Sequence, residues 1–526
     1  MCKGLSNVFI YDTTLRDGSQ GEGISFTLED KLKIVKKLDE FGVNYIEAGN
    51  PGSNPKDLEF FKEIKDYKLN SKLVAFGSTR RVGIKAEDDK GLKSLLSANT
   101  PAVAIFGKSW DLHVTDIIRT TLDENLSMIE DTVKYMKLMG KEVIFDAEHF
   151  FDGYKNNKEY ALNSLKSAEK AGADFVVLCD TNGGTMPWEV ETIVKDVLKN
   201  VNVKVGIHCH NDTGMAVANS VVAAKCGVVQ IQGTINGYGE RCGNANLITI
   251  IGNLNLKLNI DCLTKNNISQ LTNVSKAVAE IANMTHDKSY PYVGASSFAH
   301  KGGMHIDGVC KNSVSFEHIN PEVVGNERRF LMSEVSGKST ILSSIQKIVP
   351  NIRKDSKEAQ DMVDMLKKLE YEGYQFEGAE SSFELVIRKC LGKTKEFFKV
   401  INCRVIEEAT EDSVSCAMIK LKVDGKEEVT AAEGDGPVNA MDKALRKALL
   451  VFYPEIKNIK LTDYKVRVLD TDKTTGARVR VHIETSDGDI SWGTVGVSTN
   501  IIEASWRALL DSIVYFLYRE IDKKSN

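Results

Sequence analysis

One pattern recurs eight times between about residue 8 and residue 258. Each time, a short run rich in β-branched residues leads through a polar or glycine-containing turn into an amphipathic stretch. The predicted strands are Val8–Asp12, Tyr45–Gly49, Leu73–Ser78, Ala102–Gly107, Glu142–Glu148, Asp174–Asp180, Lys204–His210 and Val228–Ile235. Eight strand–helix units in roughly 250 residues predict an α/β fold of the closed (β/α)₈, or TIM, barrel type. A doubly wound open sheet is the alternative, since local pattern does not reveal closure.

The segments between these strands carry helix signals. The predicted helices are Thr27–Phe41, Leu122–Met139, Pro187–Asn200 and Thr213–Cys226. Thr27, followed three residues later by Asp30, resembles an N-terminal capping pair, and Pro187 suits a first helical turn.

Polar residues gather at the C-terminal ends of the predicted strands, and the N-terminal ends show no such set. In strand order they are Arg16, Asp17, Glu47, Arg80, Glu148, Asp180, Thr181, His208, His210, Asn236 and Asn244. A barrel brings all eight C-terminal ends around one mouth, where barrel enzymes place their chemistry. An open sheet would spread them along an edge, so this distribution favours the barrel.

The pattern changes twice after the barrel. Residues 265–390 are helical in pattern with glycine-containing breaks, and Asp355–Glu372 is predicted as a charged amphipathic helix. Residues 395–520 contain an internal repeat of strands, a glycine-rich turn and a helix. In register, Asn439, Asp442 and Arg446 match Asn500, Glu503 and Arg507. We therefore expect a barrel domain (1–264), a helical linker subdomain (265–390) and a duplicated βββα domain (391–526) for ligand sensing or dimerisation.

Composition argues against several kinds of partner. A formal charge of −5 on 526 residues disfavours nucleic acid. No stretch approaches the ~20 apolar residues of a membrane span, and Met1–Ile10 does not resemble a signal peptide. The ten cysteines are scattered without a CxxC pair, which is typical of reduced thiols. We expect a cytoplasmic protein that acts on small molecules.

His208 and His210 are the strongest local signal. Side chains at i and i+2 on a strand point to one face, so both imidazoles enter the same space. Imidazole commonly binds divalent metals, although two polar residues closing the barrel is the alternative. Asp17 is a candidate third ligand, or else a turn residue, and Asn244 a fourth ligand, or a turn residue beside Gly243. Mn, Mg, Zn and Co all remain open, and the site requires the first and seventh strands to end close together.

Other residues at the same mouth suit a 2-oxo acid bound to such a metal. Arg16 could stabilise the alkoxide that forms from the keto group, and Thr181 could donate to the carboxylate. A structural ion pair is the alternative for Arg16. Glu47 and Arg80 are further candidates for substrate binding. Glu148, ending an apolar strand, and His305, beside flexible glycines, are candidates for acid–base work, or else exposed loop residues.

Four motifs together resemble one enzyme family. DTTLRDG (12–18), HCHND (208–212), GYGERCGNAN (237–246) and FAHKGGMHIDG (298–308) are similar to the 2-isopropylmalate, citramalate and homocitrate synthases. These belong to the DRE-TIM superfamily, which also contains HMG-CoA lyase. The resemblance covers nearly the whole chain, because 395–520 is similar to the family's regulatory domain.

The resemblance implies a metal-dependent acyltransferase that condenses acetyl-CoA with a 2-oxo acid. It implies a metal held by Asp17, His208 and His210 with Asn244, a keto oxygen stabilised by Arg16 and a carboxylate bound by Thr181. Glu148 and His305 would deprotonate the acetyl methyl group. It further implies a homodimer in which the histidine-bearing linker reaches the partner's barrel.

DAEHFFDGY (146–154) and EAGNPGSNP (47–55) are more like the citramalate synthase branch than typical 2-isopropylmalate synthases. That branch implies pyruvate as acceptor, (R)-citramalate as product, and feedback by isoleucine at the C-terminal domain. 2-Isopropylmalate synthase, with 2-oxoisovalerate as acceptor, is the alternative, followed by a lyase similar to HMG-CoA lyase. A metallohydrolase is a third class, but its HxH pair usually lies on the first strand. One departure is Phe316, which stands where family members often carry a tyrosine; either the phenol is dispensable here, or another group such as Tyr290 or Tyr292 replaces it.

Overall fold

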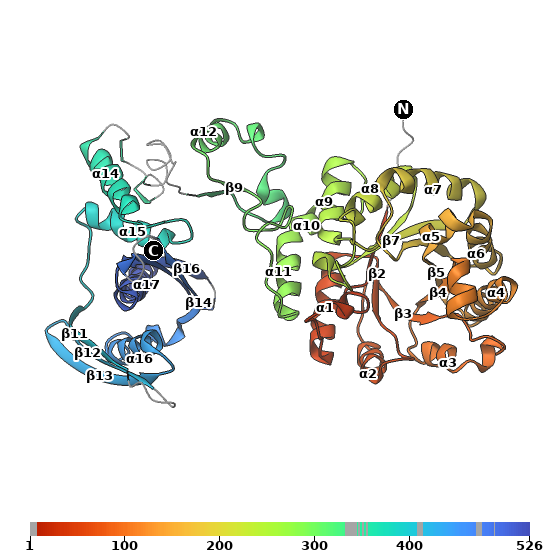
Figure 1. Ribbon diagram of the computed structural model, residues 1–526, viewed down its shortest axis with the longest axis horizontal. Helices are drawn as coiled ribbons and strands as arrows, with labels where there is room; N and C mark the ends of the chain where they lie inside the picture. Colours follow the sequence, from red (N-terminus) through yellow and green to blue (C-terminus); the bar gives the residue numbers. More distant parts are fainter. Residues whose placement is uncertain are drawn as a thin grey trace. The chain divides into compact units, whose positions relative to one another are not determined.

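The computed structural model describes residues 8–331, 345, 348–349, 352–353, 356–407, 414–469, 476–488 and 490–525. The chain forms two compact units (Figure 1). The first comprises Met1–Phe298 with Ile319–Arg328, and the second Ala299–His318 with Arg329–Asn526. No helix in the described part of the chain is long and apolar enough to cross a membrane.

The first unit contains the predicted closed barrel, in which eight parallel strands pair in chain order and β8 pairs with β1. The strands are β1 (Phe9–Asp12), β2 (Tyr45–Gly49), β3 (Lys72–Ser78), β4 (Ala102–Lys108), β5 (Glu142–Glu148), β6 (Phe175–Asp180), β7 (Lys204–Cys209) and β8 (Gln230–Gly233). The barrel prediction is therefore confirmed, and the open sheet is wrong. The largest difference from the predicted bounds is at β8, which is only four residues long.

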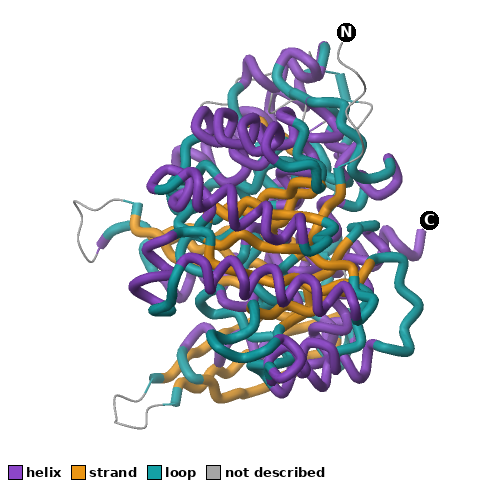
Figure 2. The backbone as a smooth tube through the Cα atoms, turned by 90° about the vertical axis from the view of Figure 1, so that its right-hand side faces the viewer, coloured by secondary structure: helices purple, strands orange, loops and turns teal. Residues whose placement is uncertain are grey.

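Helices surround the strands (Figure 2). They are α1 (Leu28–Phe41), α2 (Pro55–Ile64), α3 (Lys90–Ser97), α4 (Leu122–Leu138), α5 (Phe150–Asn156), α6 (Lys158–Lys170), α7 (Pro187–Asn200), α8 (Ala216–Cys226), α9 (Leu247–Lys257), α10 (Lys265–Ile268) and α11 (Leu271–Ile281). The predicted cap is present: Asp30 N–H donates to Thr27 Oγ1, and Thr27 N–H donates to Asp30 Oδ2. Helix α8 begins at Ala216, three residues later than predicted.

Two apolar layers hold the barrel. Inside, a cluster of buried side chains that includes Tyr11, Tyr45 and Phe175 fills the space between the strands. Outside, the strands pack against the helices, and this layer extends to Leu271 and Val274 of α11. The barrel is therefore a packed core, and space for chemistry remains at its mouth.

The second unit contains the predicted duplication. Strands β11 (Lys399–Ile406), β12 (Ser415–Val423) and β13 (Lys426–Gly434) form one antiparallel sheet, followed by α16 (Pro437–Leu449). Strands β14 (Lys460–Val468), β15 (Val479–Ser486) and β16 (Ser491–Ser498) form the other, followed by α17 (Ile501–Ser525). Alternating burial along β12 shows that one face of its sheet packs on the core.

The rest of the second unit precedes the repeat. It contains β9 (Ala299–His300), α12 (Gly303–Lys311), β10 (Arg329–Phe330), α14 (Lys357–Tyr371) and α15 (Glu380–Cys390). Helix α14 corresponds to the predicted helix from Asp355, a residue that lies outside the described residues. Ser382 of α15 donates to Asp511 of α17 at 2.7 Å and accepts from the Val495 N–H at 3.0 Å. The segment before residue 390 is therefore built into the second repeat.

Candidate metal centre and active site

Asp17, His208 and His210 form a compact buried cluster at the barrel mouth. Asp17 Oδ2 lies 3.1 Å from His208 Nε2 and 3.8 Å from His210 Nε2. Their candidate ligand atoms all lie within 4.8 Å of one another, a spacing that one cation can bridge. Strand β8 lies between β1 and β7, and Asp17 comes from the loop that follows β1.

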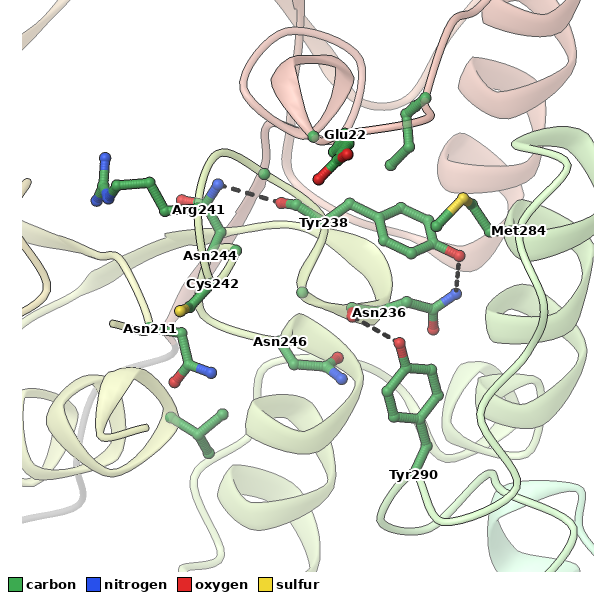
Figure 3. Close-up of a pocket in the computed structure, with 16 residues that line it drawn as sticks. Glu22, Asn211, Asn236, Tyr238, Arg241, Cys242, Asn244, Asn246, Met284 and Tyr290 are labelled. Atoms are coloured by element: carbon green, nitrogen blue, oxygen red, sulfur yellow. Dashed lines mark hydrogen bonds between the residues drawn. The ribbon is translucent and has the colours of Figure 1, made fainter. Parts of the chain in front are cut away.

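Asn244 supports the same assignment. Its backbone pairs with that of His210, and its Nδ2 donates to the Tyr238 carbonyl at 3.1 Å (Figure 3). The Oδ1 atom is buried and accepts no hydrogen bond from the described residues. A buried acceptor without a donor is costly, and a bound cation would satisfy it. The donor set of one carboxylate, two imidazoles and one amide oxygen therefore fits a divalent metal.

The charges in the cluster also suit a cation. Burial opposes ionisation of Asp17, but the Arg16 guanidinium and the hydrogen bond to His208 hold the pKa of this carboxyl well below its usual range. Burial, aided by the His208 imidazole, lowers the pKa of His210 to about 4. Burial works against protonation of His208, yet Asp17 raises its pKa. In the metal-free protein a proton on His208 therefore competes with a metal for the same Nε2 atom.

Arg16 is fixed on two sides. Its Nε donates to Glu47 Oε1 at 2.5 Å, and its guanidinium lies 3.8 Å from the centre of the Phe76 ring. Glu47 is fully buried and also accepts from Tyr11 and from Thr13 Oγ1. Glu47, predicted as a substrate-binding residue, is not among the residues that line the mouth cavity, and its carboxylate instead holds Arg16.

A cavity of about 260 Å³ opens beside the cluster. Six of the predicted site residues line it: Arg16, Asp17, Glu148, Thr181, His208 and His210. Thr181 Oγ1 accepts from the His149 N–H at 2.9 Å, so its own proton is left to donate. The Glu148 carboxylate forms an ion pair with the Lys108 ammonium.

The other four predicted site residues do not line this cavity: Glu47 and Asn244, described above, and Arg80 and His305. The Arg80 guanidinium is held between Glu124 and Asp131 of α4, both at 2.8 Å, which indicates a structural role. His305 lies on α12 in the second unit, where its exposed ring stacks on Phe316 with centroids 4.2 Å apart.

The two tyrosines proposed to replace the family's phenol make other contacts in the first unit. Tyr290 donates to the Asn236 carbonyl (Figure 3) and Tyr292 to the Asn253 side chain.

Several residues at the barrel mouth were not predicted from the sequence. Asp146 precedes Glu148 by two positions on β5, so strand periodicity alone could have indicated it. Lys108, Phe76 and Phe106 carry no comparable signal. Arg241 donates to both carboxylate oxygens of Asp212 and to the Thr181 carbonyl, joining the loops after β6, β7 and β8.

Three family comparisons cover the chain in succession. Residues 7–278 match the HMGL-like family, 292–373 the homocitrate synthase post-HMGL domain-like family, and 377–517 the LeuA allosteric (dimerisation) domain.

Curated relatives match end to end. The (R)-citramalate synthase of Aquifex aeolicus is 54% identical over 518 residues, covering 98% of both chains. That of Geobacter sulfurreducens is 51% identical, again covering 98% of each. The 2-isopropylmalate synthase of Methanocaldococcus jannaschii is 30% identical, covering 96% of this chain and 94% of its own. The chain therefore belongs to the HMGL-like family, among the (R)-citramalate synthases.

Proposed function

We propose that this chain condenses acetyl-CoA with pyruvate and water to give (R)-citramalate and CoA, in isoleucine biosynthesis. The observation that carries the proposal is the Asp17–His208–His210 cluster beside Arg16, in a chain 54% identical to an (R)-citramalate synthase. The reaction transfers an acetyl group and forms a carbon–carbon bond, so the enzyme is an acyltransferase.

Asp17, His208 and His210 would hold a divalent metal, with Asn244 as a further ligand. The bound metal would supply a Lewis acid for the keto group of the 2-oxo acid. Arg16, held by Glu47 and Phe76, balances the negative charge that develops on the keto oxygen. Thr181 donates its free proton to the acceptor carboxylate.

Carbon–carbon bond formation needs a base for the methyl group of acetyl-CoA. Glu148 and His305 are assigned to this proton transfer. The resulting carbanion adds to the keto carbon, the alkoxide gains a proton, and water cleaves the thioester to release CoA. As the family resemblance implies, the proposal includes a homodimer in which α12, the helix that carries His305, serves the partner's barrel. Phe316, stacked on His305, would position its ring without a phenol.

The limited volume of the mouth cavity favours a small acceptor. Phe76 and Phe106 both line it, and their rings stack with centroids 5.2 Å apart. The cavity of about 260 Å³ must also admit the acetyl group. Pyruvate has a methyl group where 2-oxoisovalerate has an isopropyl group, and each added carbon shifts binding by ~1–3 kcal/mol.

An acceptor screen tests this assignment. Release of free CoA is followed with acetyl-CoA and either pyruvate or 2-oxoisovalerate, at matched concentrations. We expect kcat/KM to be at least tenfold higher with pyruvate. A preference for 2-oxoisovalerate would replace the proposal with 2-isopropylmalate synthase, and cleavage of a hydroxyacyl-CoA without condensation would indicate a lyase.

For regulation, we propose that the LeuA-type domain binds isoleucine as feedback effector in the cytoplasm. A cavity of about 530 Å³ between α16 and β14 supports this. Val438, Ile459 and Leu461 offer it an apolar surface, and the Asp442–Arg446 ion pair, with 2.8 Å between Arg446 Nε and Asp442 Oδ1, forms its charged edge.

A further inference from the structure

A buried chain of polar side chains leads away from the metal cluster. His208 Nδ1 lies 3.0 Å from Gln232 Oε1, and Gln232 Nε2 lies 3.2 Å from Asp146 Oδ1. All three side chains are buried, with Gln232 fully so. His208 and Gln232 are register partners on β7 and β8, whereas Asp146 belongs to β5, which does not pair with β8.

The chemistry of the three groups fixes one hydrogen-bond direction. The Asp146 oxygen facing Gln232 accepts, so the amide presents its NH₂ group to Asp146 and its oxygen to His208. An amide oxygen cannot donate, so His208 Nδ1 carries the proton. Nε2, which faces Asp17 Oδ2 at 3.1 Å, is then the nitrogen that would bind the metal once its proton leaves.

Neither Gln232 nor Asp146 is among the residues proposed above to bind metal or substrate or to transfer protons. Burial, and then the Glu47 carboxylate, raises the pKa of Asp146 to about 7. The contact of Asp146 Oδ1 with the Gln232 amide nitrogen fits an ionised carboxylate, and it also fits a neutral carboxyl with its proton on Oδ2. The second Gln232 N–H has a long contact of 3.5 Å to Gln230 Oε1.

We propose that Asp146 and Gln232 are positioning residues that set the His208 tautomer and so tune the affinity of the barrel for its divalent metal. This inference rests on the proposed metal site. Outer partners that orient a ligating imidazole typically change metal affinity by ~10–100-fold when removed.

Metal titration of the full-length, chelator-treated protein tests the proposal without relying on activity. Mn²⁺ or Co²⁺ alone is the probe, with affinity from competition against a chromophoric chelator and the Co²⁺ absorption spectrum as a second readout. Gln232→Leu is expected to weaken binding by ~10–100-fold. Asp146→Leu is expected to weaken it by about threefold or more, since the amide is then free to turn.

Two further variants separate positioning from general damage. Gln230→Leu removes an equally buried glutamine of β8 that reaches Gln232 only through the long 3.5 Å contact and has no hydrogen bond to His208 among the described residues. It should leave affinity within about threefold of wild type. In the double variant Asp146→Asn/Gln232→Glu, one carboxylate oxygen at position 232 still accepts from His208. The hydrogen bond between positions 146 and 232 is reversed, with the new amide donating to the new carboxylate. This variant should also bind metal within about threefold of wild type.

Wild-type affinity in Gln232→Leu, or an equal loss in Gln230→Leu, would overturn the positioning role. A double variant as weak as Gln232→Leu would overturn it too. Failure of the wild-type protein to bind either ion would instead remove the metal assignment of Asp17, His208 and His210.

Discussion

At the scale of single residues, Asp17 faces three cationic or potentially cationic groups. Arg16 Nη1 lies 3.5 Å from its carboxylate, and the two imidazoles lie 3.1 and 3.8 Å away. This arrangement keeps the carboxylate ionised in a buried place, which is what a metal ligand requires. Loss of Asp17 would therefore remove a metal ligand and also the carboxylate beside Arg16, the residue proposed to face the substrate.

Replacing Asp17 or His208 with alanine should therefore abolish condensation while leaving the fold largely intact. We expect at least a hundredfold loss of CoA release and a matching loss of bound Mn²⁺, with unchanged circular dichroism. Thr192→Ala, on the exposed surface of α7, is the control. Full activity in either alanine variant would rule out the metal assignment.

Thr181→Val should act on acceptor binding. The change keeps the shape of the side chain and removes both the hydroxyl proton that is free to reach a carboxylate and the acceptor of the His149 N–H. A hydrogen bond to a charged group contributes about 1.5–3 kcal/mol, so the KM for pyruvate should rise ~10–100-fold. Thr213→Val, on another loop of the same mouth, is the matched control, since its hydroxyl donates to the Gly183 carbonyl. An unchanged KM for pyruvate would show that another residue binds the pyruvate carboxylate.

The positions of site residues were predictable from the sequence where a motif or strand periodicity applied. His208 and His210 share a face because they are two apart on one strand. Arg80 sits at a strand end as expected, yet its partners Glu124 and Asp131 come from α4, a tertiary contact without sequence signal. The link from Gln232 to Asp146 crosses 86 positions and depends on closure of the barrel.

At the scale of elements, the strands were predictable because buried parallel strands are continuous β-branched runs. The ends of the strands were less predictable. Strand β8, for example, stops at Gly233, and a 3₁₀ helix follows at Ile235–Gly237. The π-helix at His113–Ile117 has no periodicity that separates it from a loop. Capping residues were the clearest local signal, as Thr27 demonstrates.

The Thr27 cap should have a measurable effect on stability. Thr27→Ala removes the acceptor for the Asp30 N–H at the start of α1. We expect a loss of about 1 kcal/mol in the free energy of unfolding and a fall of roughly 2–4 °C in the melting temperature of the barrel unit. Calorimetry measures both, and Thr192→Ala within α7 should cause no such loss. Equal melting temperatures for the two variants would show that the Thr27 cap does not stabilise the fold.

Asp511 of α17 should make stability depend on pH. Burial raises the pKa of this carboxyl from 3.8 to about 6. The folded state then binds the proton more tightly than the unfolded chain, so stability falls as the pH rises from about 4 to about 6. Asp511→Asn keeps an acceptor for the Ser382 hydroxyl and removes the charge. We expect the variant to gain about 1–2 kcal/mol at pH 8 and nothing near pH 4, by thermal unfolding. A gain in the free energy of unfolding that is the same at both pH values would contradict the raised pKa of Asp511.

At the scale of the whole molecule, the family boundaries and the packing divide the chain differently. The LeuA-type domain matches residues 377–517, whereas the second unit also takes in Ala299–His318 and the segment from Arg329. Gly373 and Gly378 pack closely on the second repeat: Arg480 donates to the Gly373 carbonyl, and a side chain at Gly493 would collide with the Gly378 carbonyl. The sequence predicted the duplication but not this packing, because the contacts join segments about a hundred residues apart.

That packing determines how feedback should be removed experimentally. A chain ending at residue 390 loses Val495 from an apolar cluster that contains Phe376, Phe383 and Ile387. The exposed apolar surface should cause aggregation, so loss of isoleucine inhibition in this truncation would be ambiguous. Val438→Trp instead fills the cavity between α16 and β14 and leaves α15 and α17 in place.

We expect Val438→Trp to retain the uninhibited rate of CoA release and to lose at least tenfold in sensitivity to isoleucine, because the indole occupies the space of the effector side chain. Ile401→Trp, at an exposed position of β11, is the matched control and should remain inhibited. Both proteins should elute as dimers, at about twice 58.2 kDa, so that altered assembly does not explain the result. A Val438→Trp enzyme with wild-type inhibition would place the isoleucine sensor outside this cavity, while leaving the assignment of the barrel chemistry unchanged.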